Sequence, residues 1–234
     1  MEKIYGRKPV LDTIDAGLKI YRAYIIKQDS KIIGQIIDKL SKKNIEINFV
    51  DKRFFDKIDM NHQGVMIEAE SFKYKDLSDL ENYKRLIILD QIEDPHNLGA
   101  IIRSAESFGF DGVIIPERRS ASVTPIVYKT SAGAINNIDI IMVKNITRSI
   151  EEIKKAGFWV YGLAGEADSP INKTDLKGKI ALVVGNEGKG VSRLVRENCD
   201  ILINIPMKGF VNSLNASVAS AIAMYEVLRQ NGFE

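Results

Sequence analysis

Apolar residues recur in two patterns that alternate along most of this chain. Short runs rich in Ile, Val and Leu, such as residues 86–90 and 180–185, predict buried strands. Longer segments with apolar residues three and four positions apart, such as residues 95–108, predict helices. Because the strands are apolar throughout and alternate with helices, we expect an α/β fold with a parallel sheet that helices cover on both faces. The other strands expected in this part are residues 112–116, 140–143, 158–163 and 201–205, and the other helices are residues 124–134, 146–156 and the C-terminal segment.

Residues 1–70 show the same alternation on a smaller scale. Pro9 stands near the start of an expected helix that Gly17 ends, and Ser30 and Asp51 stand at the N-cap positions of two more. Strands are expected at residues 21–26, 45–50 and 64–70. We therefore predict a separate small domain with a mixed or parallel sheet.

Residues 71–84 are polar and charged, without a sustained period, and predict a linker. The predicted domains are therefore residues 1–70 and 85–234.

Two of the expected strands, at residues 180–185 and 201–205, run directly into loops rich in Gly, Asn and Ser. Parallel sheets bind ligands at the carboxyl ends of their strands, and small residues let a ligand approach the main chain closely. The loop after Gly185 is not a P-loop, because Val191 stands where the lysine belongs, and it lacks the G-x-G-x-x-G order of dinucleotide sites. Glu187 would also repel a polyphosphate. These loops therefore predict one small-molecule pocket of another kind.

Composition and charge narrow the class of protein without naming a partner. The chain has 33 basic and 31 acidic residues, a net charge of +2, so an RNA partner must be bound by local basic patches. The single Cys199 excludes an intramolecular disulfide and suits a reducing cytoplasm. No apolar run approaches the roughly 20 residues of a membrane span, and the N-terminus lacks a signal-peptide core. We therefore expect a cytoplasmic protein that does not enter a membrane, and its two histidines and one cysteine, far apart, predict no metal site.

The start of the helix expected at residue 95 carries several polar residues. Asp94 is a suitable N-cap and Pro95 a suitable first helical residue, while Arg103 lies off the buried stripe on the same side as His96. Taken singly, Arg103 is an ordinary surface arginine and Asn97 a hydrogen-bonding residue at a helix start.

Three segments of the chain together carry more information than any of these residues. Residues 94–99 read DPHNLG and are followed by Arg103, residues 182–188 read LVVGNEG, and residues 205–219 read IPMKGFVNSLNASVA. In this order they resemble the three motifs of the SpoU/TrmH family of RNA ribose methyltransferases. Ile4-Tyr5-Gly6 and His62-Gln63-Gly64-Val65 resemble the substrate-binding domain of its RlmB-like branch, which modifies a guanosine ribose in 23S ribosomal RNA.

The resemblance implies a fold, a methyl donor and a partner. It implies a trefoil-knotted (SPOUT) methyltransferase domain, a small L30e-like N-terminal domain that binds substrate, and a homodimer. The implied donor is S-adenosylmethionine, with no metal. The residues that match its binding site are Ala164, Gly165, Gly185, Asn186, Gly188, Ile205, Met207, Ser213 and Leu214.

The resemblance also implies a catalytic set. By the family's pattern this set is Arg103, Asn97, Glu187, Ser213 and Asn215. A guanidinium hardly loses its proton in a protein, so we expect Arg103 to grip a phosphate and place the ribose hydroxyl rather than act as a base. Arg7, Arg118 and Arg119 are candidates for RNA contact, with solvated surface as the default interpretation.

Three functions stay open at this point. The first is methylation of a 23S ribosomal RNA guanosine, which the N-terminal module favours. The second is the same chemistry on transfer RNA or at another ribosomal site. The third is a non-catalytic RNA-binding or ribosome assembly factor, against which the intact catalytic set argues.

Overall fold

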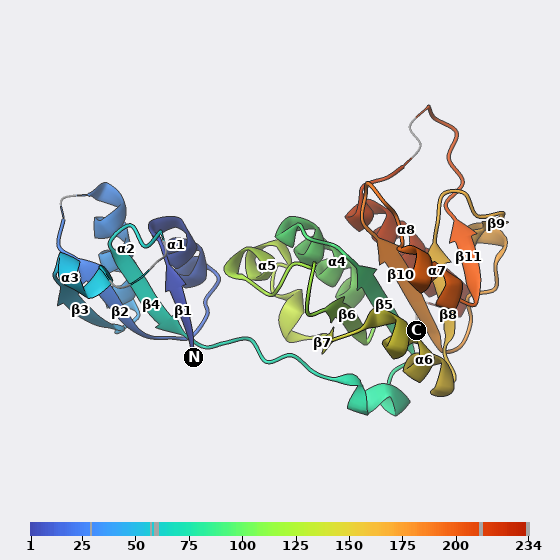
Figure 1. The fold of residues 1–234 in the computed structure, drawn as a ribbon, viewed down its shortest axis with the longest axis horizontal. Helices are drawn as coiled ribbons and strands as arrows, with labels where there is room; N and C mark the ends of the chain where they lie inside the picture. Colours follow the sequence, from blue (N-terminus) through green and yellow to red (C-terminus); the bar gives the residue numbers. More distant parts are fainter. Residues whose placement is uncertain (29, 57, 59–60, 211–212, 233–234) are drawn as a thin grey trace. The chain divides into compact units, whose positions relative to one another are not determined.

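The structure, a computed structural model, describes residues 1–28, 30–56, 58, 61–210 and 213–232. Asn212, part of the third motif, lies outside the described residues. The chain forms two compact units, Met1–Lys73 and Tyr74–Glu234, and each combines strands with helices (Figure 1).

The first unit is built on a four-stranded mixed sheet in the order β1-β4-β2-β3. β2 and β3 are parallel, whereas β4 is antiparallel to both β1 and β2. Residues of α1 and α2, including Val10, Ile14, Ile33 and Ile36, share one buried core with the sheet. The elements are β1 (Glu2–Tyr5), α1 (Arg7–Asp15), β2 (Ile20–Ile26), α2 (Lys31–Lys42), β3 (Glu46–Val50), α3 (Lys52–Phe55) and β4 (Val65–Ala69).

The helix ends of this unit follow the sequence signals, with one difference. Gly17 has φ 74° just after α1, and the Asp51 side chain accepts a hydrogen bond from the Phe54 N–H at the start of α3. Ser30 stands at the N-cap position of α2, but its side chain makes no cap hydrogen bond. Its hydroxyl instead accepts a hydrogen bond from the Arg7 guanidinium at 3.3 Å. Strand β1 was not predicted, because its four residues at the sheet edge are only partly buried and show no apolar alternation.

The second unit is built on a seven-stranded sheet in the order β7-β6-β5-β10-β8-β11-β9. Every pairing in it is parallel, as the apolar strands predicted. Its strands are β5 (Arg85–Asp90), β6 (Gly112–Pro116), β7 (Asp139–Val143), β8 (Trp159–Leu163), β9 (Ser169–Pro170), β10 (Ile180–Gly185) and β11 (Ile201–Asn204). Its helices are η1 (Leu77–Asn82), α4 (Pro95–Ser107), α5 (Pro125–Thr130), η2 (Ala134–Asn136), α6 (Ile146–Lys155), η3 (Ile171–Lys173), α7 (Arg193–Asn198) and α8 (Ala216–Asn231).

Helices cover both faces of this sheet. Residues of α6 and α7, such as Ile150 and Val195, share a core with Ile88 and Val183 of the central strands. On the other face α4 packs against α8 and α5, and α8 contacts β10. The short α7 was not predicted, because only Val195 among its six residues is buried.

The order of the strands places β10 between β5 and β8. Because the strands are parallel, the loops after β5, β6, β8, β10 and β11 all leave the same edge of the sheet. The trefoil knot that the resemblance implies stays a prediction, since strand order alone does not define how the chain threads.

The segment expected as a linker mostly belongs to the second unit. The Lys75 N–H donates to the Ile140 carbonyl at 2.9 Å, so this residue runs beside β7. Leu80 of η1 and Tyr83 are buried, and the Tyr83 hydroxyl donates to Asp139 at 2.7 Å. The two buried side chains stand among charged neighbours without a sustained period, so the sequence pattern did not indicate that they are packed.

Candidate functional site

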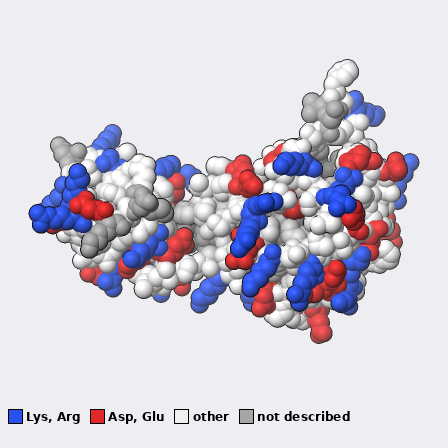
Figure 2. Space-filling model, in the orientation of Figure 1, with Lys and Arg blue, Asp and Glu red and all other residues white. Residues whose placement is uncertain are grey.

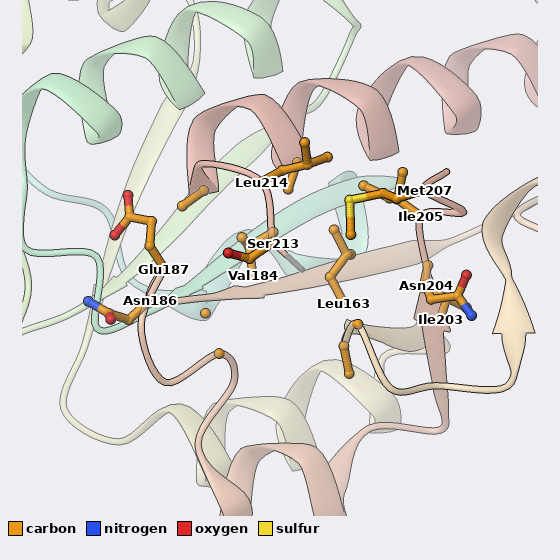
Figure 3. A pocket seen from close by; sticks show the side chains of 16 residues that line it. Leu163, Val184, Asn186, Glu187, Ile203, Asn204, Ile205, Met207, Ser213 and Leu214 are labelled. Atoms are coloured by element: carbon orange, nitrogen blue, oxygen red, sulfur yellow. The ribbon is translucent and has the colours of Figure 1, made fainter. Parts of the chain in front are cut away.

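The loops after β8, β10 and β11 surround a cavity of about 130 Å³ at the carboxyl edge of the large sheet. Figure 3 shows Glu187 and Asn186 at one end of the cavity and Ile205 and Met207 at the other. A larger cavity of about 760 Å³ shares nine lining residues with the first, so the two form one continuous depression. The first cavity is lined by Leu163, Ala164, Gly165, Val184, Gly185, Asn186, Glu187, Gly190, Ile203, Asn204, Ile205, Met207, Ser213, Leu214, Ala216 and Ala219.

The loop after β10 folds back so closely that only glycine fits at its start. A Cβ atom added to Gly185 would lie 2.1 Å from the carbonyl carbon of Gly190. The Gly190 N–H donates to the Asn186 carbonyl at 2.7 Å and closes the turn. The main chain of this loop therefore forms a wall of the cavity without side chains in the way.

Asp90 and Gln91, at the end of β5, hold the same loop from the neighbouring strand. The buried Asp90 carboxylate accepts a hydrogen bond from the Ser192 N–H at 2.7 Å. The Asn186 side-chain amide donates to the Gln91 carbonyl at 3.3 Å. Neither Asp90 nor Gln91 was singled out from the sequence, because an acidic residue at the end of a strand is common at a turn.

Three polar side chains from distant parts of the chain meet beside this loop. Asn97, in the first turn of α4, donates its amide to Glu187. Asn215 donates to the Asn97 side-chain oxygen at 3.0 Å and to Glu187 at 3.3 Å. The Asn215 side-chain oxygen also caps α8 by accepting from the Ser217 and Val218 N–H groups. The three side chains therefore hold one another in fixed orientations at the Glu187 end of the cavity.

The predicted donor-binding residues all line this depression. Eight of them line the first cavity, and Gly188 lines the second. Ser213, which was assigned to both the donor site and the catalytic set, lines both cavities. The structure thus brings together residues from the second motif, the third motif and the loop after β8, whereas no residue of the first motif lines either cavity.

Arg103 is not brought into this depression. Its side chain is exposed on α4 and lines neither cavity. It lies six residues after Asn97, about 9 Å further along the helix axis. Among the described residues it has no hydrogen-bonding or ionic partner.

The three predicted RNA-contact arginines differ in their surroundings. Arg118 and Arg119 are exposed in the loop after β6, which leaves the sheet at the same edge as the loop after β10. Arg7, in the first unit, is already engaged, since its guanidinium donates to the Gln63 carbonyl and to the Ser30 hydroxyl. Figure 2 shows basic and acidic side chains interspersed over the visible surface, as the small net charge indicates.

Several residues of the larger cavity were missed by the sequence analysis. The charged ones are Glu166, Lys189 and Arg196, and they come from the loop after β8, the loop after β10 and α7. No local pattern could reveal them, because each is a charged residue of an ordinary kind and only the folded chain brings them together.

The Cys199 side chain packs against the hydrophobic core of the second unit, next to β8. Its Sγ lies near Gly162 of β8, where an added Cβ would come within 2.9 Å of it. Burial, and then the negative charge of Asp200, raise the pKa of the Cys199 thiol to about 12. The thiol is therefore protonated and unreactive at neutral pH.

Within the described residues, no group of three or more His, Cys, Asp and Glu side chains is placed to hold a metal ion. No helix in that part of the chain is long and apolar enough to cross a membrane.

Comparisons with known proteins match both units. The model of the SpoU rRNA methylase family matches residues 84–225, and that of the RNA 2′-O ribose methyltransferase substrate-binding domain matches residues 3–75. The Bacillus subtilis protein YacO, whose name assigns it to the TrmH family of tRNA/rRNA methyltransferases, is 40% identical over 97% of this chain and 95% of its own. A Staphylococcus saprophyticus protein named in the same way is 42% identical over 98% of this chain and 96% of its own.

Solved structures give the same fold. The SpoU methyltransferase AviRb from Streptomyces viridochromogenes, in complex with the cofactor AdoMet, superposes with a TM-score of 0.65 at 23% identity, over 97% of this chain and 89% of its own.

Proposed function

Because the chain belongs to the SpoU rRNA methylase family, we propose that it transfers the methyl group of S-adenosylmethionine to the 2′-hydroxyl of a guanosine ribose in 23S ribosomal RNA. The observation that supports this most is the joined set of Asn97, Glu187 and Asn215 at one end of a cavity walled by main chain. A non-catalytic RNA-binding factor would have no need to keep three distant polar side chains in mutual hydrogen bonds beside such a cavity.

Transfer RNA is the second candidate substrate. The names of the two relatives say tRNA/rRNA, so they favour neither RNA over the other. The N-terminal match to a substrate-binding domain supports an additional contact surface for a large structured RNA.

The cavity suits an adenosine-containing donor. Ile205, Met207 and Leu214 supply an apolar part for a planar base, while the glycines of the loops leave backbone N–H and C=O groups close to its edge. Glu187 and Ser213 supply polar groups for the sugar and the positively charged sulfonium. When bound, the donor would supply an activated methyl group on a good leaving group.

The residues of the chain would then prepare the nucleophile. A ribose hydroxyl is weakly nucleophilic and must be placed in line with the methyl group as it loses its proton. Arg103, exposed and without a described partner, is available to bind the RNA phosphate next to the ribose in a bidentate manner. The hydrogen-bonded set of Asn97, Glu187 and Asn215 would orient the ribose and the donor.

A homodimer would cover an apolar stripe on α8. Val218, Ile222 and Tyr225 are 46, 40 and 48% exposed, although their spacing of four and three residues places them on one face of the helix. The Tyr225 ring contacts Phe108 at the end of α4 edge-on, with 5.9 Å between ring centroids. We propose that a second copy packs on this stripe, and sedimentation of Ile222→Asp should give a monomer where the wild type gives a dimer. A wild-type monomer at micromolar concentration would contradict the proposed dimer.

The deciding experiment is methyl transfer from labelled donor to unmodified RNA, followed by mapping of the 2′-O-methyl position. Ribosomal RNA and total transfer RNA are tested in parallel. Label in a guanosine ribose of 23S RNA is expected, label in transfer RNA alone would select the second candidate, and no label in either would contradict the proposed activity.

Arg103→Ala tests the role of the arginine. Turnover should fall at least about a hundredfold, the scale of a lost positioning group, while the affinity for S-adenosylhomocysteine stays near that of the wild type, because Arg103 lines neither cavity. Arg148→Ala, an exposed arginine of α6 paired with Glu152, is the matched control. Methylation by Arg103→Ala at the wild-type rate would remove the residue from the mechanism.

A further inference from the structure

The two parts of the depression differ in the charges that line them. Among the described residues, Glu187 is the one charged residue that lines the smaller cavity. The larger cavity adds Glu166, Lys189 and Arg196. Glu187 is already bound by the amides of Asn97 and Asn215. Apart from Glu187, the charged side chains that can meet a ligand therefore lie in the larger cavity.

Glu166 and Arg196 form an ion pair in the lining of this larger cavity. The Arg196 Nη2 atom lies 2.5 Å from the Glu166 carboxylate, and the two side chains are 36 and 61% exposed. Glu166 lies in the loop after β8 and Arg196 in α7, so the pair joins two separately anchored elements. Their partial exposure leaves both groups accessible from the cavity, and it also makes their mutual attraction weak.

We propose, as an extension of the proposed function on which it rests, that Glu166 and Arg196 bind the amino-acid end of the methyl donor. The planar guanidinium of Arg196 would donate hydrogen bonds to the ligand carboxylate, and Glu166 would accept hydrogen bonds from the ammonium group. A zwitterion needs one cation and one anion a few ångströms apart, which is the arrangement that this ion pair already has. The apolar end of the smaller cavity is left for the base.

The same pair is poorly suited to the RNA backbone. A phosphate brings no cation to meet the Glu166 carboxylate, which would repel it, whereas the ammonium group of an amino acid offsets the same repulsion of its own carboxylate. Lys189, exposed on the loop after β10, is the cation of this cavity better placed for RNA, since no described acidic group pairs with it.

The proposal makes binding depend on the amino-acid end of the ligand. S-adenosylhomocysteine carries both charged groups, its decarboxylated analogue lacks the carboxylate, and 5′-methylthioadenosine lacks both. Arg196→Gln should weaken S-adenosylhomocysteine at least about tenfold, the scale of a lost charged hydrogen bond, and leave the other two ligands within about twofold. Glu166→Gln should weaken S-adenosylhomocysteine and its decarboxylated analogue but leave methylthioadenosine unchanged.

Calorimetric titration of the full chain at low salt measures all three ligands. Arg193→Gln is the matched control, because Arg193 is also on α7, pairs with Glu197 at 3.0 Å and lines neither part of the depression. It should bind every ligand as the wild type does. RNA affinity, measured by filter binding, should not change in Arg196→Gln.

Three other outcomes would contradict the proposal that Glu166 and Arg196 bind the amino-acid end of the donor. Equal weakening of all three ligands by Arg196→Gln would mean that the pair only braces the loops. Loss of RNA affinity with unchanged ligand binding would assign the pair to the RNA. Failure of the wild type to bind any of the three ligands would instead contradict the proposed function itself.

Discussion

The close return of the loop after β10 makes Gly185→Ala the most direct test of the site geometry. The added Cβ would lie 2.1 Å from the carbonyl carbon of Gly190 and 2.2 Å from the nitrogen of Val191. Carbon atoms in contact are normally about 3.5–4.0 Å apart, so one backbone must move by roughly 1.5 Å. These are main-chain atoms, and no rotation of a side chain can relieve the clash.

The loss of stability expected in Gly185→Ala depends on the hydrogen bonds that hold the loop after β10 in place. Movement would strain the hydrogen bond from the Gly190 N–H to the Asn186 carbonyl and the one from the Ser192 N–H to Asp90, both 2.7 Å long. Overpacking of this kind costs about 1–3 kcal/mol. In a domain of this size 1 kcal/mol lowers the Tm by roughly 2–4 °C, so the expected decrease is about 2–12 °C. The affinity for S-adenosylhomocysteine should also fall, since the loop is a wall of the cavity.

Thermal unfolding followed by circular dichroism measures the first effect, and calorimetry measures the second. Gly188→Ala is the control for stability, because an added Cβ there meets its nearest atom, the Asn186 side-chain oxygen, at 3.4 Å. A Gly185→Ala protein that unfolds at the wild-type temperature and binds the ligand unchanged would refute the loop geometry described above.

Two further predictions concern other contacts. Glu187→Ala removes the acceptor of the buried Asn97 amide and should cost about 1–3 kcal/mol of folding free energy, whereas Glu187→Gln keeps a carbonyl acceptor and should cost less; equal Tm values for the two variants would contradict the role of this hydrogen bond. The pKa of the Cys199 thiol, raised to about 12 by burial, predicts that iodoacetamide alkylates the folded protein at pH 8 at least about a hundredfold more slowly than the urea-unfolded chain. The unfolded thiol ionises near pH 8.5, so the stability that the protonated thiol contributes is complete below that pH and declines as the pH rises toward 12. In urea titrations, Cys199→Ala should therefore lose less stability over this pH range than the wild type does.

Much of the fold was predictable because it depends on local signals. The apolar strands predicted the parallel sheet, and Asp94 caps α4 by accepting from the His96 N–H at 2.9 Å, as its position before Pro95 indicated. The pocket was predictable for the same reason, since loops that follow parallel strands meet at one edge. Here residues of the second and third motifs do line one depression.

What was missed depends on contacts between distant segments. Tyr83 is packed because its hydroxyl reaches Asp139, 56 residues away. The ion pair of Glu166 and Arg196 joins two elements that carry no shared pattern. Arg103, assigned to the catalytic set by its place in the first motif, lies exposed on α4 and lines neither cavity, so its role stays a prediction.

The central position of β10 has a consequence for the synthesis of the chain. β5 ends at residue 90, but its neighbour β10 begins only at residue 180. One edge of β5 therefore stays unpaired while the ribosome adds about ninety more residues. The first unit, by contrast, is closed by β4, which ends at residue 69, and has all its partners early. A ribosome stalled near residue 170 should therefore carry a first unit that resists protease and a second unit that is still digested.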